Sequence, residues 1–137
     1  MSVPLHLGPG SAVPVWIEAL EAANFGKPWG ELDDHEHLWA IEPCGFARWQ
    51  VIPVAQQAEL IRIAVGDLWR RQGQGRALLR HSEAMLARMG ITALFLEVRV
   101  SNLAARSLYE EEGWVAQGLR PGYYRDGEDA ALYRRDL

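Results

Sequence analysis

The sequence has one cysteine, no excess of positive charge and no long apolar run, and each shortage excludes a class of protein. With Cys44 alone no intrachain disulfide can form, which indicates a reducing compartment. The net charge of −4 argues against nucleic acid as a direct partner, because phosphate binding needs a basic surface. No segment reaches the roughly 20 apolar residues of a membrane helix, and residues 1–14 lack the pattern of a signal peptide. We therefore expect a cytoplasmic protein that has no membrane partner.

Metal ligands are also scarce. His35 and His37 lie in an acidic stretch without a third convincing ligand, so we expect no metal site. Cys44 follows a turn proline, where a small packed residue is favoured over a nucleophile.

The chain of 137 residues has the length of one domain. Hydrophobic residues make up 49% and charged residues 23%, which is typical of a globular protein. No low-complexity tract, repeat or linker divides the chain, so residues 1–137 are expected to form a single domain.

Periodicity and turn residues predict an α/β fold, with one mixed sheet flanked by helices. Helices are expected at residues 11–24, 75–89 and 103–112. Strands are expected at residues 3–7, 38–41, 45–52, 58–65, 91–100, 114–119 and 130–135. The apolar run 91–100 predicts a strand covered on both faces, as in a parallel arrangement.

A glycine-rich loop follows the strand that ends at Val65. Gly73 and Gly75 open the next helix, where free backbone N–H groups and the helix dipole favour an anion. Nearby arginines add positive charge: Arg70, Arg71 and Arg76. The loop therefore predicts a phosphate site, with a simple glycine-containing helix start as the alternative.

Two common phosphate motifs do not fit this loop. A nucleotide P-loop needs Gly-Lys-Ser/Thr, but Gly75 is followed by Arg76 and Ala77. A dinucleotide fingerprint needs a third small residue where Leu78 stands.

The arrangement Arg70-x-x-Gly73-x-Gly75-x-Ala77-Leu78-Leu79 resembles the pyrophosphate loop of the GNAT acetyltransferases. The resemblance implies the GNAT fold and acetyl-CoA as cosubstrate. It also implies that the preceding strand binds the pantetheine arm through backbone groups. The coenzyme-binding residues implied are Ile63, Ala64, Val65, Arg70, Arg71, Gln72, Gly73, Gln74, Gly75 and Arg76.

Glu97 is unusual because a buried, unpaired carboxylate inside an apolar strand costs several kcal/mol. Taken alone, it is expected to pair with Arg99, two residues along on the same strand face. Asn102 taken alone is a helix cap, and Tyr109 a core aromatic.

Together, residues 96–110 resemble the RimI type of GNAT enzyme, the bacterial ribosomal-protein-alanine N-terminal acetyltransferases. These enzymes carry Leu-Glu-Val-Arg-x-Ser-Asn-x-x-Ala-x-x-Leu-Tyr-Glu at this place, as this chain does. The resemblance implies that Glu97 is the general base and Tyr109 the general acid. It also implies that Asn102 contacts the coenzyme.

The likeness continues into segments that shape the peptide-binding side in that family. They are Pro28-Trp29 and the stretch from Gly113 to Ala130. The acceptor contacts implied are Trp29, Arg120, Tyr123, Tyr124, Glu128 and Asp129. The chain departs from the family in having Asp67 in place of a proline, a short segment 125–127 and a trimmed N-terminal half, where substrate loops lie.

The activity implied is acetyl transfer to a primary amine, with a protein N-terminal alanine as leading acceptor and a small-subunit ribosomal protein as candidate partner. A small-molecule amine or a lysine side chain is the alternative acceptor. A non-catalytic acyl-CoA-binding module is a third reading, but such a module needs neither Glu97 nor Tyr109.

Overall fold

The computed structural model describes residues 4–137, and the predicted elements are present in the predicted order. The strands are β1 (Leu5–Leu7), β2 (Glu36–Ile41), β3 (Gly45–Ile52), β4 (Gln57–Val65), β5 (Ala93–Arg99), β6 (Val115–Arg120) and β7 (Ala130–Asp136). The helices are α1 (Val15–Phe25), α2 (Gln74–Arg88) and α3 (Leu103–Glu111). Residue 3 of the first predicted strand lies outside the described residues. The first helix begins four residues late because Pro14 occupies its N-cap position and not its first turn.

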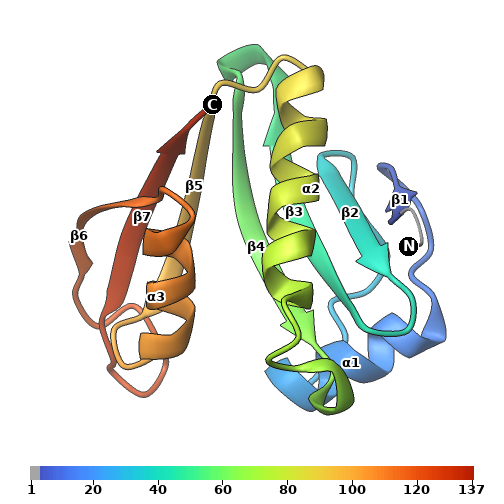
Figure 1. Ribbon diagram of the computed structural model, residues 1–137, viewed down its shortest axis with the longest axis horizontal. Helices are drawn as coiled ribbons and strands as arrows, with labels where there is room; N and C mark the ends of the chain where they lie inside the picture. The colour runs from blue at the N-terminus through green and yellow to red at the C-terminus, as the bar shows by residue number, and fades with distance from the viewer. Residues whose placement is uncertain (1–3) are drawn as a thin grey trace.

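The seven strands form one mixed sheet in the order β1-β2-β3-β4-β5-β7-β6 (Figure 1). All neighbouring strands are antiparallel except β4 and β5, which are parallel. Among residues 4–137, no helix combines the length and apolar character that a membrane span requires. The α/β class and the helix-flanked mixed sheet are thus confirmed.

The sheet opens between β4 and β5 (Figure 1). Their pairing ends at Leu60 and Leu96, although both strands continue. At this point Arg48 and Trp49 of β3 pair with Arg62 and Leu60 of β4, so Ile61 is an extra residue. Such a bulge bends a strand and raises its twist, and it coincides with the divergence of β4 from β5.

Two hydrophobic clusters lie on opposite faces of the sheet. The larger one packs α2 and α3 against the strands, around Leu78, Leu79 and Tyr109. The smaller one packs Ile17 of α1 against Ala64 of β4 and neighbouring strands. The helices therefore cover different faces, as a mixed sheet of this kind requires.

The prediction that residues 91–100 are covered on both faces was wrong. Leu94, Leu96 and Val98 of β5 are buried in the larger cluster, but the alternate residues Glu97 and Arg99 are only half-buried. The parallel pairing with β4 is confirmed over four residues. Beyond them the edge of β5 that faced β4 borders an open cleft, because β4 has moved away.

Candidate active site

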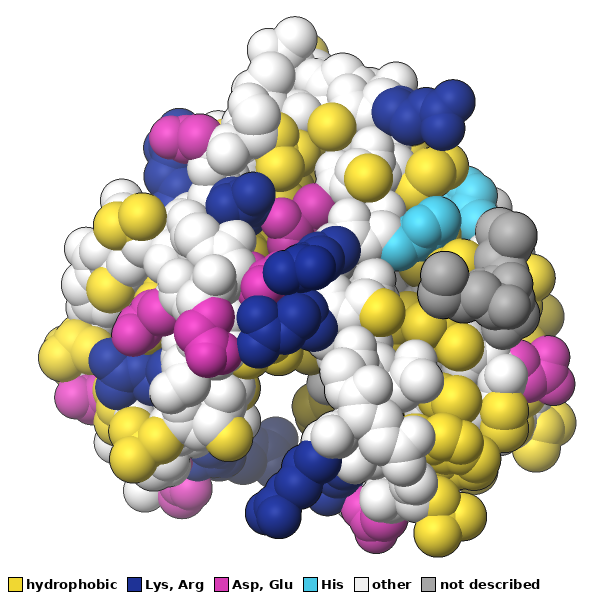
Figure 2. All heavy atoms as spheres, viewed as in Figure 1, with side chains coloured by type: hydrophobic (Ala, Val, Ile, Leu, Met, Phe, Trp, Pro, Cys, Tyr) yellow, Lys and Arg dark blue, Asp and Glu magenta, His cyan; other side chains and the backbone are white. Residues whose placement is uncertain are grey.

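A cleft of about 770 Å³ occupies the space where β4 and β5 separate. Figure 2 shows the molecule hollowed between the part that carries α3 and the part that carries α2, with Lys and Arg side chains around the opening. The cleft lies between β4, β5, α3, the end of α1 and the β6–β7 loop. Its lining residues are Asn24, Phe25, Trp29, Glu59, Leu60, Ile61, Arg62, Ile63, Leu96, Glu97, Val98, Arg99, Asn102, Ala105, Tyr109, Tyr123 and Tyr124.

Glu97 points from β5 into this cleft and is held by one carboxylate oxygen. Its Oε1 accepts a hydrogen bond from Arg120 Nη1 at 2.8 Å. Its Oε2 is shielded from solvent and has no hydrogen-bond partner among the described residues. The carboxylate is thus oriented by Arg120, while its second oxygen is buried and unpaired.

The expected pair between Glu97 and Arg99 was wrong. Arg99 Nη1 lies 2.8 Å from Asp126 Oδ2 and 2.9 Å from Glu128 Oε1. These acidic residues follow β6 in sequence, and the β6–β7 loop brings them over the end of β5. Arg99 therefore pairs with residues distant in sequence and not with its neighbour Glu97.

Tyr109 reaches the cleft from α3 and is only 5% exposed. Its ring packs at a tilt against Trp114 and Tyr133, with centroids 5.9 and 6.2 Å away. Burial raises the pKa of the Tyr109 phenol well above its ordinary value. The hydroxyl consequently carries its proton at neutral pH.

Glu59 is a second carboxylate in the cleft, and sequence reasoning missed it. It lies on β4, and burial raises its pKa, with the negative charge of Glu97 adding to the effect. The signal that singled out Glu97, a charge inside an apolar strand, was also present here. Arg62 on the same strand carries that signal too.

The predicted acceptor residues divide into two groups. Trp29, Tyr123 and Tyr124 line the cleft, and the two tyrosine rings pack edge to face at 5.0 Å. Arg120 stacks over Tyr123 at 4.8 Å while it binds Glu97, and interaction with Glu97 raises the pKa of Tyr123. Of these side chains, Arg120 contacts Glu97 directly.

Glu128 and Asp129 brace the β6–β7 loop instead of lining the cleft. Glu128 Oε2 accepts a hydrogen bond from Ser101 N at 2.9 Å, in addition to the pair with Arg99. Asp129 Oδ1 accepts from Gly122 N at 2.9 Å. Their predicted contact with the acceptor stays a prediction.

The predicted phosphate loop forms the N-terminus of α2. Gly73 occupies the N-cap position with φ of 78°, a left-handed conformation that suits glycine, and no side chain caps the helix. The first turn, which includes Gln74 and Gly75, therefore presents backbone N–H groups to a ligand. Gln72 Nε2 donates to Leu68 O at 3.1 Å and helps to close the loop.

The three arginines of this loop have different surroundings. Arg70 donates to Val65 O at 2.9 Å and pairs with Asp67, so it ties the loop to β4. Arg76 turns toward α3, where it pairs with Glu111 and with Glu112. Within residues 4–137, the Arg71 side chain forms no ion pair. The predicted contact of Arg71 with a phosphate stays a prediction.

The end of β4 supplies a backbone edge to the cleft. The side chains of Ile63 and Val65 pack against the larger cluster, and Ala64 lies in the smaller one. Because pairing with β5 ended at Leu60, the side of β4 that faces β5 has no strand partner beyond it, while the other side stays paired with β3. Asn102 caps α3, its Oδ1 accepting from Ala105 N at 3.2 Å, and also lines the cleft.

No group of three or more His, Cys, Asp or Glu side chains in the described part of the chain is arranged to hold a metal ion. His37 lies in β2, where its ring nitrogen Nδ1 is 2.9 Å from His6 Nε2, and it stacks with Trp39.

Comparison with known proteins agrees with this geometry. Residues 10–114 match the Acetyltransferase (GNAT) family. The [ribosomal protein bS18]-alanine N-acetyltransferase of Escherichia coli strain K12 is 45% identical over 121 residues, covering 85% of this chain and 77% of that protein. An N-alpha-acetyltransferase of Saccharolobus solfataricus is 37% identical over 95 residues, covering 68% of this chain and 57% of that protein.

Solved structures give the same result. The crystal structure of the ribosomal-protein-S18-alanine N-acetyltransferase from Escherichia coli superposes with a TM-score of 0.77. That comparison covers 98% of this chain and 94% of the other, at 30% identity. The family match, the sequence likeness and the shared fold show that this chain belongs to the acetyltransferase (GNAT) family.

Proposed function

We propose that this GNAT acetyltransferase transfers the acetyl group of acetyl-CoA to the α-amine of an N-terminal alanine on a ribosomal protein. The similarity to the Escherichia coli bS18-alanine enzyme over most of the chain supports this acceptor. A ribosomal-protein acceptor implies action in the cytoplasm. Residues 1–137 act as one domain in this proposal.

One observation carries the catalytic part of the proposal: Glu97 and Tyr109 line the same cleft at the point where the sheet opens. Glu97 has a free, oriented oxygen, and Tyr109 is a buried phenol that keeps its proton. A base and an acid facing one space are what amine acylation requires.

Groups around the cleft fit acetyl-CoA. The N-terminus of α2 and the side chain of Arg71 would hold the pyrophosphate, and the free edge of β4 would bind the pantetheine arm. Asn102 lines the same cleft as the catalytic pair and would contact the coenzyme. The coenzyme, when bound, supplies the acetyl group as a thioester.

The residues of the chain then move two protons. Glu97 takes a proton from the acceptor ammonium, directly or through a water, because a protonated amine has no lone pair for attack. Backbone N–H groups at the end of β4 stabilise the negative charge that develops on the carbonyl oxygen. Tyr109 gives its proton to the thiolate as the C–S bond breaks, and the second proton lost by the acylated nitrogen restores the phenol.

The acceptor side of the cleft suits a peptide N-terminus. Glu59 and Glu97 attract an ammonium group, and Trp29, Tyr123 and Tyr124 provide flat surfaces for the first residues of a peptide. Aromatic walls and a carboxylate would also accept a lysine or a small amine, so the acceptor needs a direct test.

The test uses two peptides incubated with the protein and acetyl-CoA and weighed by mass spectrometry. One begins with a free alanine and contains no lysine, and the other has a blocked N-terminus and one internal lysine. Gain of one acetyl group by the first peptide alone supports the proposal. Gain by the second alone assigns a lysine acetyltransferase. If neither gains mass, release of free CoA with a panel of amines separates a small-molecule enzyme from a non-catalytic acyl-CoA-binding module.

A further inference from the structure

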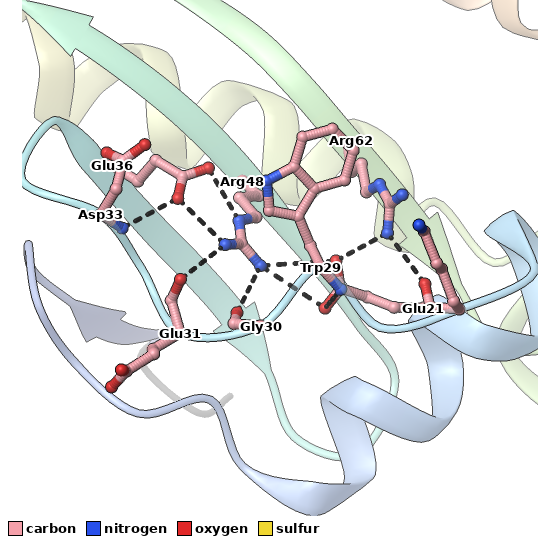
Figure 3. A network of polar contacts seen from close by, with 9 residues as sticks. Glu21, Trp29, Gly30, Glu31, Asp33, Glu36, Arg48 and Arg62 are labelled. Atoms are coloured by element: carbon pink, nitrogen blue, oxygen red, sulfur yellow. Dashed lines mark hydrogen bonds and ion pairs between the residues drawn. The ribbon is translucent and has the colours of Figure 1, made fainter.

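Two buried arginines lie side by side at the cleft, and one of them, Arg62, also lines it. Arg48 of β3 is 0% exposed and pairs in register with Arg62 of β4, which is 8% exposed. Glu21 of α1 and Glu36 of β2, also buried, neutralise them (Figure 3). Burying four charges requires that each finds partners, because an unpaired buried charge is very costly.

The pairs are closely made. Arg48 binds Glu36 through two hydrogen bonds of 3.0 Å, from Nε and from Nη2. Glu21 Oε2 lies 3.1 Å from Arg62 Nη1 and 3.5 Å from Arg48 Nη1, so it bridges the two arginines. The four side chains thus form a single network that joins α1 to three strands.

This network also binds the backbone of residues 26–31, which we name the Trp29 loop. Arg62 donates to Lys27 O at 3.3 Å, and Arg48 donates to Gly30 O and Glu31 O, each at 3.1 Å. Trp29 N donates to Glu21 Oε1 at 3.4 Å. Four backbone groups of one loop are consequently fixed by three buried charges (Figure 3).

The side chain of Trp29 depends on the same network. The guanidinium carbon of Arg62 lies 4.2 Å from the Trp29 ring centroid and 4.4 Å from that of Phe25. Trp29 is 54% exposed, yet it lines the cleft together with Tyr123 and Tyr124. Arg62, which lines the same cleft, therefore supports one face of the Trp29 ring.

We propose that Arg62, held by Glu21 and Arg48, is a positioning residue that fixes the Trp29 loop in its acceptor-binding conformation before the acceptor arrives. This inference rests on the proposed function, because it assigns the loop to the acceptor. A loop fixed in advance loses little entropy when a peptide binds, so the network contributes to acceptor affinity. Apolar residues at these positions would stabilise the fold as well as the ion pairs do, so stability alone does not explain the network.

The test removes one ion pair as a unit with Glu21→Gln/Arg62→Gln, which keeps the buried charge balanced because Arg48 and Glu36 still pair. The matched control is Glu83→Gln/Arg135→Gln, which removes an ion pair that joins α2 to β7 away from the loop. Arg62→Lys is a milder third variant that keeps the charge but loses the planar stacking. The thermal unfolding of each variant is measured first, and kinetics are compared below the lowest midpoint.

Hydrogen exchange of residues 26–31 gives a readout that does not depend on activity. We expect the Trp29 amide to exchange at least about tenfold faster in Glu21→Gln/Arg62→Gln than in the parent, with α2 and β5 unchanged. In the control pair the Trp29 amide keeps its parent rate. Unchanged exchange in both double variants overturns the proposal, even if the protein acetylates none of the peptides offered.

Steady-state kinetics supply the second readout. For an accepted peptide, KM should rise about tenfold in Glu21→Gln/Arg62→Gln while kcat and the KM for acetyl-CoA stay within about twofold of the parent. Arg62→Lys should give an intermediate KM. A fall in kcat with an unchanged peptide KM, or an equal rise of KM in the control pair, contradicts a positioning role.

Discussion

Arg120 and Glu97 form an ion pair at the wall of the cleft, with 2.8 Å between Nη1 and Oε1. Arg120 reaches across from β6, whereas Glu97 lies on β5, and β7 separates the two strands in the sheet. The arginine side chain is 56% exposed, and its stacking on Tyr123 holds it over the carboxylate. One oxygen of Glu97 is therefore fixed, and the buried Oε2 has no hydrogen-bond partner among the described residues.

Replacing Glu97 by glutamine should lower kcat by about 10²-fold or more, because an amide does not take a proton from the acceptor. Calorimetric titration with acetyl-CoA should give nearly the parent affinity, since the predicted coenzyme groups lie elsewhere. Turnover at the parent rate would remove Glu97 from the mechanism.

Tyr109→Phe should also reduce kcat, by about tenfold or more, because the departing thiolate loses its proton donor. Tyr133→Phe is the matched control: Tyr133 is equally buried, but its hydroxyl binds Arg106 and Glu110 and does not line the cleft. The rates are measured with a poor acceptor, so that chemistry limits turnover. A rate within twofold of the parent for Tyr109→Phe would argue against an acid role.

Glu59→Gln should raise the thermal midpoint at neutral pH but not under acidic conditions. Burial raises the pKa of Glu59, so the folded protein binds this proton more tightly than the unfolded chain does. The stability linked to Glu59 is complete below its unfolded pKa and is lost as the pH rises through the folded pKa. The Glu59→Gln variant has no carboxylate to ionise at this position, so it does not lose this stability as the pH rises.

Thermal scans between about pH 4 and pH 8 check this expectation for Glu59. Glu42→Gln, on an exposed turn, corrects for the removal of one negative charge. A stability difference that is independent of pH would show that Glu59 is ionised at no cost in the cleft.

Gly73→Ala should weaken acetyl-CoA binding, whereas Gly10→Ala should not. Both glycines have φ of 78° and open space where a Cβ would lie, so each substitution should cost a similar stability of about 1 kcal/mol. Gly73 alone sits at the N-cap of α2, where strain displaces the N–H groups predicted to bind phosphate. Equal coenzyme affinity in the two variants would place the phosphate elsewhere.

Local patterns in the sequence determined most of the fold. The apolar period of residues 75–89, with Gly90 after it, predicted α2 to within one residue at each end. The run around Glu97 predicted β5, because apolar side chains at such density must be buried. Asn102 was identified as a cap since capping depends only on the neighbouring backbone.

Charged residues inside the strands were harder to interpret. Local spacing paired Glu97 with Arg99, but the folded chain pairs it with Arg120 from a strand two places away in the sheet. Glu83 of α2 is likewise buried, against Arg135 of β7 and Trp114. The partner of a buried charge depends on which distant segments fold over it, and spacing along one strand or helix carries no such information.

The sequence by itself determined the order of helices and strands, the glycine loop and, through the family pattern, the residues Glu97 and Tyr109. Only the tertiary structure decided that β4 leaves β5 after Leu60, which creates the cleft that both residues line. It also decided that Glu21, Arg48 and Arg62 meet beneath the Trp29 loop. Periodicity reports which side of an element is buried, but long-range packing selects which buried groups face one another.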